Sequence, residues 1–363
     1  MGVGLMQKCL IYKGIKLLLI IIVVLSVLSG CNAEKPAVKA LVEDPGNSGV
    51  QNVPVQKSNE SNKEIIITLV PKSLDNPVFL DAKEESERVA SELGIKVEWL
   101  GSMQADANEQ VAIVERLIIR HVDGIIISCL DPAKMQPVIN KAIVAGIKVA
   151  TFDSDSPGSD RLFYCGTDNH AAGEACGKAL INVLQSKGKQ NAELNLLVMT
   201  ADEDSLNLDQ RLLSFLSTVE RGGVRLKLID TLYCRDDINL AGDMLEKYIR
   251  KATNVDVFFS TGGWPLVAPY ESLPGFQKWC KNGGTSIVVD TFYPIVNAAK
   301  NGLADALIGQ DFKKMGELST RNIYNAITGK GSISSRFINT GLEYGSKDNY
   351  DILLKNKKPW EIK

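Results

Sequence analysis

The chain has 363 residues, of which 45% are hydrophobic and 23% are charged, as in ordinary globular proteins. This length suits about two domains of roughly 100–200 residues each. The net charge of −2 gives no basic excess for binding nucleic acid. The only two histidines, His121 and His170, lie far apart in the sequence. The composition therefore argues against a multi-histidine zinc site and against chemistry that needs a histidine base.

The first 30 residues are predicted to be a signal peptide. Lys8, Lys13 and Lys16 precede a 12-residue apolar run, Leu17–Leu28. The run is short for a membrane-spanning helix but suits a secretory signal. It ends in "LSGC", which resembles the end of a bacterial lipoprotein signal and implies cleavage before Cys31 and a diacylglycerol on its sulfur. The alternative is a chance cysteine beside an ordinary signal peptide.

A flexible tether is expected from residue 31 to residue 63. This stretch is rich in Pro, Asn, Ser, Gln and Lys, and it keeps no apolar period. Five further cysteines follow it, namely Cys129, Cys165, Cys176, Cys234 and Cys280. Their number is odd, no CxxC pair occurs and spacing assigns no disulfide, so we interpret them as buried free thiols.

From residue 64 onward, short β-branched runs alternate with amphipathic stretches. The pattern predicts strands at 64–70, 96–101, 124–130 and 148–153, with helices at 76–94, 106–122 and 135–146. The order repeats with strands at 194–200, 225–233, 255–261 and 286–292 and helices at 208–223, 239–252 and 276–284. Nearly all-apolar strands between helices are typical of parallel sheets covered on both faces. The sequence therefore predicts an α/β protein of two similar lobes, which bind ligands beyond the carboxyl ends of their strands.

Polar and aromatic residues follow most of these strands. They are Lys72, Asn76, Phe79, Asp131, Asp153 and Asp155 in the first half, and Asp202, Asn207, Arg211, Trp264, Asp290 and Gln310 in the second. Carboxylates and amides pair with hydroxyl groups, and aromatic faces pack on the C–H face of a sugar ring. The set therefore favours a polyhydroxylated ligand.

The motifs at these positions resemble those of type I periplasmic sugar-binding proteins, the ribose- and galactose-binding group that serves ABC transporters. In the family's order they are "VPKSLDNPVF", "VDGIIIS" followed by "DP", "GIKVATFDSDSP", "YCGTDNHAAGEACGKAL", "NLDQRLLSF", "VVDTFYPIVNAAKNG" and "ALIGQDFKKMG". The resemblance covers about Glu64 to Asn349, which is nearly the whole chain after the tether.

By this resemblance, two doubly wound, Rossmann-like lobes are joined by a three-segment hinge and close on a ligand in the cleft between them. The crossovers are expected near Gly166–Asn169, just after Gln310 and near Phe337–Thr340. The N-terminal lobe would comprise residues 64–166 and 311–337, and the C-terminal lobe residues 167–310 and 338–363. Periodicity alone does not show that 311–337 returns to the first lobe.

The resemblance also implies ligand-binding roles for single residues. The matching positions are Asn76, Phe79, Asp153, Asn207, Arg211, Asp290 and Gln310, with Asp153 as the carboxylate that takes two sugar hydroxyls. Asp155 resembles other branches of the family, while Lys72 and Trp264 are candidates from their places after strands. Val78 stands where ribose binders often have an aromatic, Ser154 where they place an arginine, and "STGGWP" replaces a polar Asn-Asp end. The substitution at Ser154 argues against ribose itself, and Trp264 is a candidate for the missing stacking face.

Structural explanations stay open for several of these residues. Asp131 and Asp155 also fit helix caps or turn formers. Arg211 fits a structural partner of a neighbouring carboxylate, Lys72 a solvated side chain and Trp264 simple packing.

The sequence therefore predicts a lipid-anchored solute-binding protein on the extracytoplasmic face of a bacterial membrane, which captures a small carbohydrate for the permease and ATPase of an ABC importer. The alternative is a binder that presents a sugar or a furanosyl autoinducer to a sensor kinase or chemoreceptor. A glycosidase is disfavoured because Asp153 and Asp155 lie only two residues apart. A lac-repressor-like regulator is disfavoured because a signal and tether take the place of its DNA-binding helices. We expect a monomer without catalytic residues, cofactor, metal or nucleic-acid partner.

Overall fold

The structure is a computed structural model that describes residues 64–203, 205–251, 254–333, 335–357 and 359. The predicted signal peptide, the tether and Cys31 lie outside the described residues. All described residues belong to one compact unit. Within these ranges, no helix has both the length and the apolar character needed to span a bilayer.

Six strands form the first sheet, in which every neighbouring pair is parallel. Across the sheet they are β11 (Phe337–Asn339), β5 (Tyr164–Gly166), β4 (Lys148–Phe152), β3 (Gly124–Ile127), β1 (Ile66–Val70) and β2 (Lys96–Trp99). Successive side chains of a strand point to opposite faces. On β3, Ile126 packs into one hydrophobic cluster, whereas Ile125 and Ile127 pack into another. The all-apolar run thus forms a strand that is buried on both sides.

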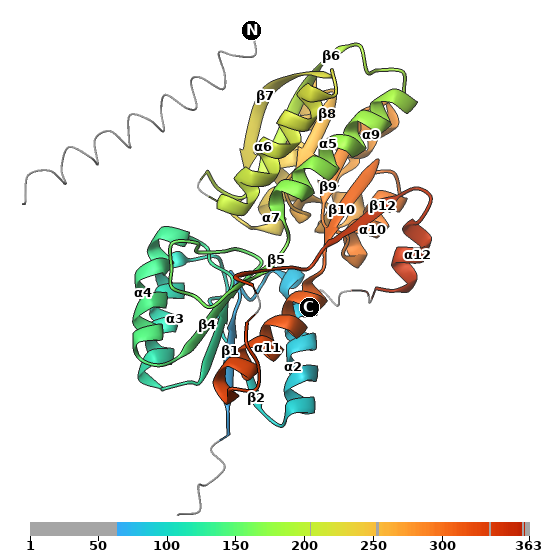
Figure 1. The fold of residues 1–363 in the computed structure, drawn as a ribbon. Coiled ribbons are helices and arrows are strands. Elements are labelled where there is room, and N and C mark those ends of the chain that lie inside the picture. The colour runs from blue at the N-terminus through green and yellow to red at the C-terminus, as the bar shows by residue number, and fades with distance from the viewer. Residues whose placement is uncertain (1–63, 204, 252–253, 334, 358, 360–363) are drawn as a thin grey trace, which may run out of the picture. The chain divides into compact units, whose positions relative to one another are not determined.

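Two pairs of helices cover this sheet (Figure 1). A 3-10 turn, η1 (Pro77–Phe79), leads into α2 (Leu80–Leu93), which packs on α11 (Phe312–Thr328), while α3 (Ala107–Ile119) packs on α4 (Pro132–Val144). Although α11 lies far along the chain, it contacts β1, β3, β4 and β5. The first sheet is therefore completed by a segment that comes after the second sheet in the sequence.

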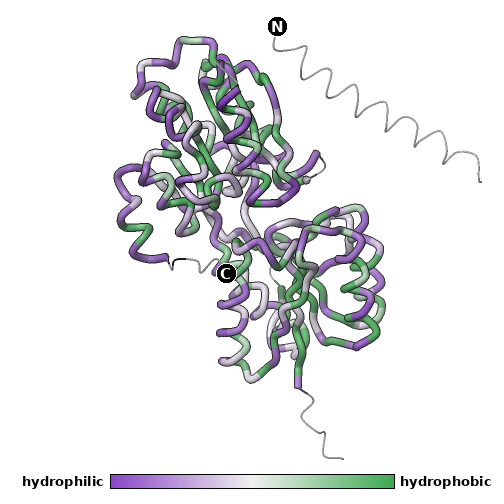
Figure 2. The backbone as a smooth tube through the Cα atoms, turned by 180° about the vertical axis from the view of Figure 1, so that it is seen from behind, coloured by the Kyte–Doolittle hydropathy of each residue, from purple (hydrophilic) through white to green (hydrophobic). Residues whose placement is uncertain are grey.

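The second sheet also has six strands, of which only β12 runs antiparallel to its neighbour. Across the sheet they are β12 (Leu342–Ser346), β10 (Ala306–Gln310), β9 (Thr285–Val289), β8 (Val257–Ser260), β6 (Glu193–Thr200) and β7 (Arg225–Tyr233). On β8, Phe259 stacks on Phe215 of one covering layer, and Phe258 packs edge-on against Phe276 of the other. In Figure 2, hydrophobic segments run through the interior of both halves of the described chain.

The helices of the second half again form two layers. One layer contains α5 (Asn169–Ser186) and α6 (Leu206–Arg221). The other layer contains α7 (Ile238–Lys251), α8 (Trp264–Val267), α9 (Pro274–Lys281) and α10 (Tyr293–Lys300). A 3-10 turn, η2 (Tyr270–Ser272), precedes α9, and α12 (Tyr350–Lys355) packs on α10. At Gly173 of α5, an added β-carbon would lie 2.2 Å from the Arg211 carbonyl oxygen of α6. Glycine therefore allows the close approach of the helix that carries Asn207 and Arg211.

The chain passes between the two sheets at three places. These are residues 167–168 between β5 and α5, Asp311 between β10 and α11, and residues 340–341 between β11 and β12. The predicted fold class, with two doubly wound halves and three connections, is confirmed. β11 extends to Asn339, two residues beyond the expected limit of the N-terminal lobe at 337. We propose that the boundaries between the N-terminal and C-terminal lobes lie at these three crossings.

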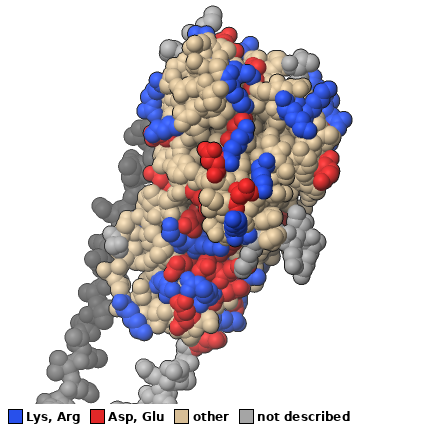
Figure 3. Space-filling view, turned by 90° about the vertical axis from the view of Figure 1, so that its right-hand side faces the viewer, with Lys and Arg blue, Asp and Glu red and all other residues tan. Residues whose placement is uncertain are grey.

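The five cysteines of the described residues are free, and all but the partly exposed Cys280 are buried. Figure 3 shows acidic and basic side chains interspersed over the lower part of the face that carries α2 and α11. There Arg88 pairs with Glu85 and Glu92, and Arg321 pairs with Glu92 and Glu317. Exposed pairs of this kind contribute little to stability, so this surface is a solvated one.

Candidate ligand-binding site

Two aspartates leave equivalent strands of the two sheets in the same unusual backbone conformation. β4 and β9 each hold the third place in their sheet, and the next residues are Asp153 with φ 57° and Asp290 with φ 86°. Non-glycine residues adopt this left-handed region rarely, at a cost of order 1–3 kcal/mol, and such residues cluster at functional sites. Both aspartates are 5% exposed. These two loops are therefore the first candidates for ligand contact.

The carboxylate of Asp153 receives a single side-chain hydrogen bond in the described part of the chain. Ser128 at the end of β3 donates to its Oδ2 at 2.7 Å. The Tyr164 hydroxyl donates to the Asp153 carbonyl at 2.9 Å, and burial, followed by the Asp153 charge, raises the pKa of that hydroxyl so that it stays a donor. An ionised carboxylate accepts about four hydrogen bonds. Asp153 therefore keeps acceptor positions for a ligand.

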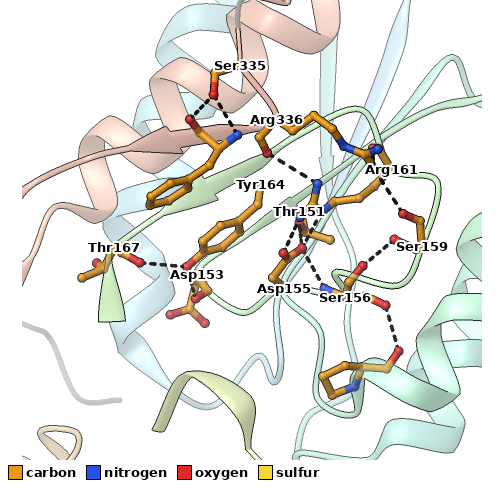
Figure 4. A network of polar contacts seen from close by, with 12 residues as sticks. Thr151, Asp153, Asp155, Ser156, Ser159, Arg161, Tyr164, Thr167, Ser335 and Arg336 are labelled. Carbon is orange, nitrogen blue, oxygen red and sulfur yellow. Dashed lines mark hydrogen bonds and ion pairs between the residues drawn. The ribbon is translucent and has the colours of Figure 1, made fainter. Parts of the chain in front are cut away.

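Asp155 has a different environment, although it lies only two residues further on. Its carboxylate forms a two-pronged ion pair with Arg161 and accepts from the Thr151 hydroxyl at 2.6 Å and the Ser156 amide at 2.7 Å. Figure 4 shows Asp155 inside this polar network and the Asp153 carboxylate outside it. The acceptor positions of Asp155 are thus used within the protein, which favours a structural role over ligand binding.

Arg211 is the centre of a buried network in the second half. Its guanidinium donates to Asn169 Oδ1 at 2.8 Å, to the Thr261 carbonyl at 2.9 Å and to Gln310 Oε1 at 2.5 Å. Gln310 Nε2 in turn donates to Asp290 Oδ1 at 2.8 Å. Arg211 and Gln310 therefore position Asp290 rather than stand free for a ligand.

Asp290 is held by the protein yet remains costly to ionise. The Gly263 amide donates to its Oδ2 at 2.9 Å, in addition to the bond from Gln310. Burial raises the pKa of the carboxyl, against the opposing effect of the Arg211 charge and these two hydrogen bonds. Hydroxyl donors of a polar ligand would offset the same desolvation.

Two asparagines bring amide groups to the strand ends. Asn207, in the first turn of α6, is 5% exposed, and its buried Oδ1 has no hydrogen-bond partner among the described residues. Such an unpaired buried oxygen calls for an explanation, and a bound ligand or water provides one. Asn76 uses its Oδ1 to cap η1 through the Val78 amide at 3.2 Å, which leaves its NH₂ group as the donor.

Phe79 lies in the core. It is 2% exposed, and its ring packs edge-on against Phe152 and Phe312. The aromatic that the sequence places after Asn76 therefore supports the first sheet. With Val78 aliphatic, the loop after β1 offers no aromatic ring for stacking.

Trp264 and Lys72 complete the set of sequence-derived candidates. Trp264, which begins α8, is 7% exposed, and its indole Nε1 donates to Asp236 Oδ1 at 2.5 Å. Lys72 follows β1 and is 6% exposed. The Lys72 charge acts on the pKa of Asp236, and the Asp153 charge acts on that of Asp290. Charges in the strand-end loops of the first sheet therefore act on carboxyl groups in the strand-end loops of the second sheet.

A cavity of about 460 Å³ lies at the strand ends of both sheets. Its lining residues are Ala105, Ala107, Leu130, Asp131, Asp202, Glu203, Ser205 and Arg235. Asp131 caps α4 through the amides of Ala133 and Lys134, both at 3.0 Å. The cap explains Asp131 without a ligand.

Three residues of this arrangement were not predicted as site residues from the sequence. Ser128 bonds Asp153, Asn169 bonds Arg211 and Asp236 bonds Trp264. A polar residue directly after the apolar run of β3 was a usable signal for Ser128. No local pattern links Asn169 to Arg211 or Asp236 to Trp264, because these partners lie 42 and 28 residues apart.

The arrangement is chemically suited to binding hydroxyl groups. Asp153 and Asp290 supply acceptors, and Asn76 and Asn207 supply one amide group each. The described residues contain no group of three or more His, Cys, Asp or Glu that could hold a metal ion. Fold and site together define a two-lobed solute-binding protein.

Comparison with known proteins identifies the family. A family model described as "periplasmic binding protein domain" matches residues 67–331. The chain therefore belongs to the periplasmic binding protein family and is a type I periplasmic sugar-binding protein. Members of this family bind solutes and are not enzymes.

Curated relatives carry sugar-binding names. The ribose import binding protein RbsB of Bacillus subtilis is 29% identical over 170 residues, which are 47% of this chain and 50% of that protein. The xylose/arabinose-binding protein XylF of Sulfolobus acidocaldarius is 22% identical over 291 residues, which are 76% of this chain and 69% of that one. The matches to RbsB proteins of B. subtilis and Haemophilus influenzae span about half the length of those relatives.

Solved structures share the fold. An ABC transporter solute-binding protein of Burkholderia graminis, in complex with D-arabinose, is 27% identical with a TM-score of 0.72, over 79% of this chain and 96% of that one. XylFII in its complex with LytSN is 25% identical with a TM-score of 0.70, over 79% of this chain and 99% of that one.

Proposed function

We propose that this protein captures a small neutral carbohydrate outside the cytoplasm and delivers it to an ABC importer. The observation that carries the proposal is the pair of buried aspartates, Asp153 and Asp290, which leave equivalent strands of the two sheets. The relatives named for ribose, xylose and arabinose, and the D-arabinose complex, support a pentose or hexose as ligand.

The protein groups suffice for useful affinity. A buried hydrogen bond to a charged partner contributes roughly 1.5–3 kcal/mol, and micromolar binding needs about 8 kcal/mol. Hydroxyls that donate to Asp153 and Asp290 would reach that range, with Asn76, Asn207 and Lys72 as further contacts. Arg211 and Gln310 hold Asp290 in place.

The test is a thermal-shift screen with pentoses, hexoses and polyols, followed by calorimetry of each sugar that binds. A ligand at 100 times its Kd stabilises the folded state by about 2.7 kcal/mol, which gives a clear rise in Tm. Asp153→Ala should remove this rise, whereas Asp160→Ala, an exposed aspartate of the same loop, should keep it. If no sugar or polyol shifts the Tm of the unaltered protein, the proposal fails.

Lipid anchoring at Cys31 is the second part of the proposal. It rests on the "LSGC" sequence after the apolar run. In a bacterial host, the full chain should partition into the detergent phase, and mass spectrometry should find a diacylglycerol on an N-terminal Cys31. Cys31→Ser should move the protein to the aqueous phase. An unmodified Cys31 in the mature protein would contradict the anchor.

A second candidate function is presentation of the sugar to a sensor protein. The observation that favours it is the similarity to XylFII, which has been solved in complex with LytSN. Deletion of the gene should abolish uptake of a radiolabelled sugar if the protein serves import. Normal uptake together with a lost transcriptional response to the same sugar would favour sensing.

A further inference from the structure

A second cavity, called the crossing cavity below, lies where the chain passes between the two sheets. Its volume is about 290 Å³, and its wall includes Asp311 and residues 340–341, which form two of the three crossings. The first turns of α2 and α11 line it from the first half, and α10, β12 and residues 356–357 line it from the second. It shares no lining residue with the cavity at the strand ends. A molecule in the crossing cavity would therefore contact both halves of the protein without occupying the strand-end site.

A buried hydroxyl group in the wall of this cavity lacks a partner. Thr340 is 3% exposed, and its Oγ1 forms no hydrogen bond with any described residue. The backbone amide of Thr340, in contrast, donates to the Gly166 carbonyl at 3.0 Å. A buried polar group that stays unpaired costs about 1–3 kcal/mol. Thr340 therefore has a hydrogen bond to offer to a molecule in the crossing cavity.

Two helices begin at the cavity wall. α10 starts at Tyr293, and its N-cap residue, Phe292, provides no side-chain cap. α11 starts at Phe312, and Asp311 caps the Lys314 amide at 2.9 Å. The first amides of a helix have no partner within the helix and carry a partial positive charge, which attracts anions. The backbone alone therefore makes two parts of the wall electropositive.

The charged side chains of the wall leave one lysine without a close partner. Lys314 pairs with Asp311 at 3.1 Å, and Lys357 pairs with Glu343 at 2.7 Å. Lys313 also lines the cavity, and its ammonium makes no ion pair within 4 Å among the described residues. Lys313 can therefore pair with the negative group of a ligand.

Asp81 limits how much negative charge the cavity accepts. This residue lies in the first turn of α2 and lines the cavity. Burial raises the pKa of its carboxyl, while the charges of Lys313 and Lys357 act in the opposite sense. A dianion such as phosphate would be repelled by this carboxylate more strongly than a monoanion, whose single charge Lys313 can balance. The wall therefore favours a ligand with one negative charge.

We propose that the crossing cavity is a second binding site, which takes a small monocarboxylate: Lys313 and the helix ends attract the carboxylate, and the Thr340 hydroxyl donates to it. The volume of about 290 Å³ lies near the lower end of the range for small-molecule sites and suits a molecule such as lactate or gluconate. Because the wall comes from both halves and from two crossings, an occupant holds the halves at one angle and changes the affinity of the sugar site. The site itself does not depend on sugar capture; only this coupling does.

Calorimetry of the sugar-free protein tests the site with L-lactate, D-gluconate and inorganic phosphate, and with lactamide as the neutral counterpart of lactate. We expect a carboxylate to bind more tightly than phosphate and lactamide not to bind. Lys313→Gln should weaken carboxylate binding about tenfold, and Thr340→Val about threefold. Lys247→Gln, the same charge change at an exposed lysine of α7, is the matched control and should leave the Kd unchanged.

Two further measurements separate ligand binding from a structural role. Thr340→Val should keep or raise the Tm of the ligand-free protein, because the hydroxyl that it removes has no partner among the described residues. A clear fall in Tm would show that this hydroxyl is bonded within the protein and would overturn its assigned role. Amide hydrogen exchange should slow at the starts of α10 and α11 and at residues 340–343 when the carboxylate binds.

The outcomes distinguish this site from the proposed sugar capture. Equal binding of lactate and lactamide, an unchanged Kd in Lys313→Gln or no binding of either carboxylate would overturn the site. By reciprocity, a saturating carboxylate should change the sugar Kd by the same factor as the sugar changes the carboxylate Kd. A sugar Kd that stays constant would overturn the coupling alone. If a carboxylate binds as described while no sugar shifts the Tm, the crossing cavity stands and sugar capture fails.

Discussion

The loops after β4 and β9 present aspartates in the same backbone conformation, yet the protein surrounds the two carboxylates differently. Among the residues that the structure describes, one side chain donates to the Asp153 carboxylate, that of Ser128. Asp290 accepts hydrogen bonds from Gln310 and the Gly263 amide. Arg211 donates to Gln310, and its positive charge lowers the pKa of Asp290. The second half of the site is therefore held in place by the protein, whereas the first half leaves more of its hydrogen bonding to the ligand. Asp153 therefore keeps more acceptor positions for a ligand than Asp290 does.

The largest expected effect comes from substituting Arg211, the centre of the buried network in the second half of the site. Arg211→Met leaves Asn169, Gln310 and the Thr261 carbonyl without their donor. Each buried acceptor that loses its donor costs about 1–3 kcal/mol, so the three together should cost at least about 3 kcal/mol. We expect that loss in the free energy of unfolding, measured by urea denaturation, together with loss of sugar binding.

The control lies on the same helix. Arg221 at the exposed end of α6 donates to the Thr218 hydroxyl at 3.2 Å, and Arg221→Met should change stability by less than about 0.5 kcal/mol. Equal stability of the two variants would show that the Arg211 network does not hold the second half of the site.

The next effect separates Asp155 from Asp153. Asp155→Asn leaves the buried Arg161 guanidinium without its ion-pair partner, so we expect a loss of about 3 kcal/mol in unfolding free energy with little change in sugar affinity. Asp153→Asn should change the unfolding free energy little but weaken sugar binding strongly. The substitution affects one hydrogen bond from a described side chain, whereas two ligand hydroxyls lose their acceptor. Urea denaturation and calorimetry measure both quantities. A loss of affinity in Asp155→Asn at retained stability would restore Asp155 to the ligand set.

This pair also shows what sequence could and could not predict. The alternation of apolar runs with amphipathic stretches was enough for two α/β halves, and the strand ends pointed to Asp153 and Asp290. Family resemblance added the return of α11 to the first sheet, which periodicity cannot show. The sequence favoured Asp153 over Asp155 but left the role of Asp155 open, because its partner Arg161 lies in a loop whose folding no local pattern specifies. Phe79 stays a prediction as a ligand contact, and the sequence could not show its packing against Phe312, which lies 233 residues away.

The smallest expected effect is the contribution of Asp290 to the pH dependence of the Tm. Burial raises the folded-state pKa of this carboxyl above its unfolded value, so the folded protein binds the proton more tightly than the unfolded chain does. The resulting stability is fully present below the unfolded pKa and is lost as pH rises through the folded pKa. Ligand-free protein should therefore gain Tm relative to Asp290→Asn as pH falls from neutral toward 4.

Sugar binding should respond to pH in the opposite sense, because the ionised carboxylate is the better acceptor of hydroxyl hydrogen bonds. The rise in Tm that a saturating sugar produces should thus shrink over the same pH interval in which the ligand-free protein gains stability relative to Asp290→Asn. Parallel pH profiles of the two proteins without sugar would show that Asp290 titrates as an ordinary carboxyl. In that case burial would not make Asp290 harder to ionise, and the two aspartates would differ only in the hydrogen bonds that their carboxylates accept from the protein.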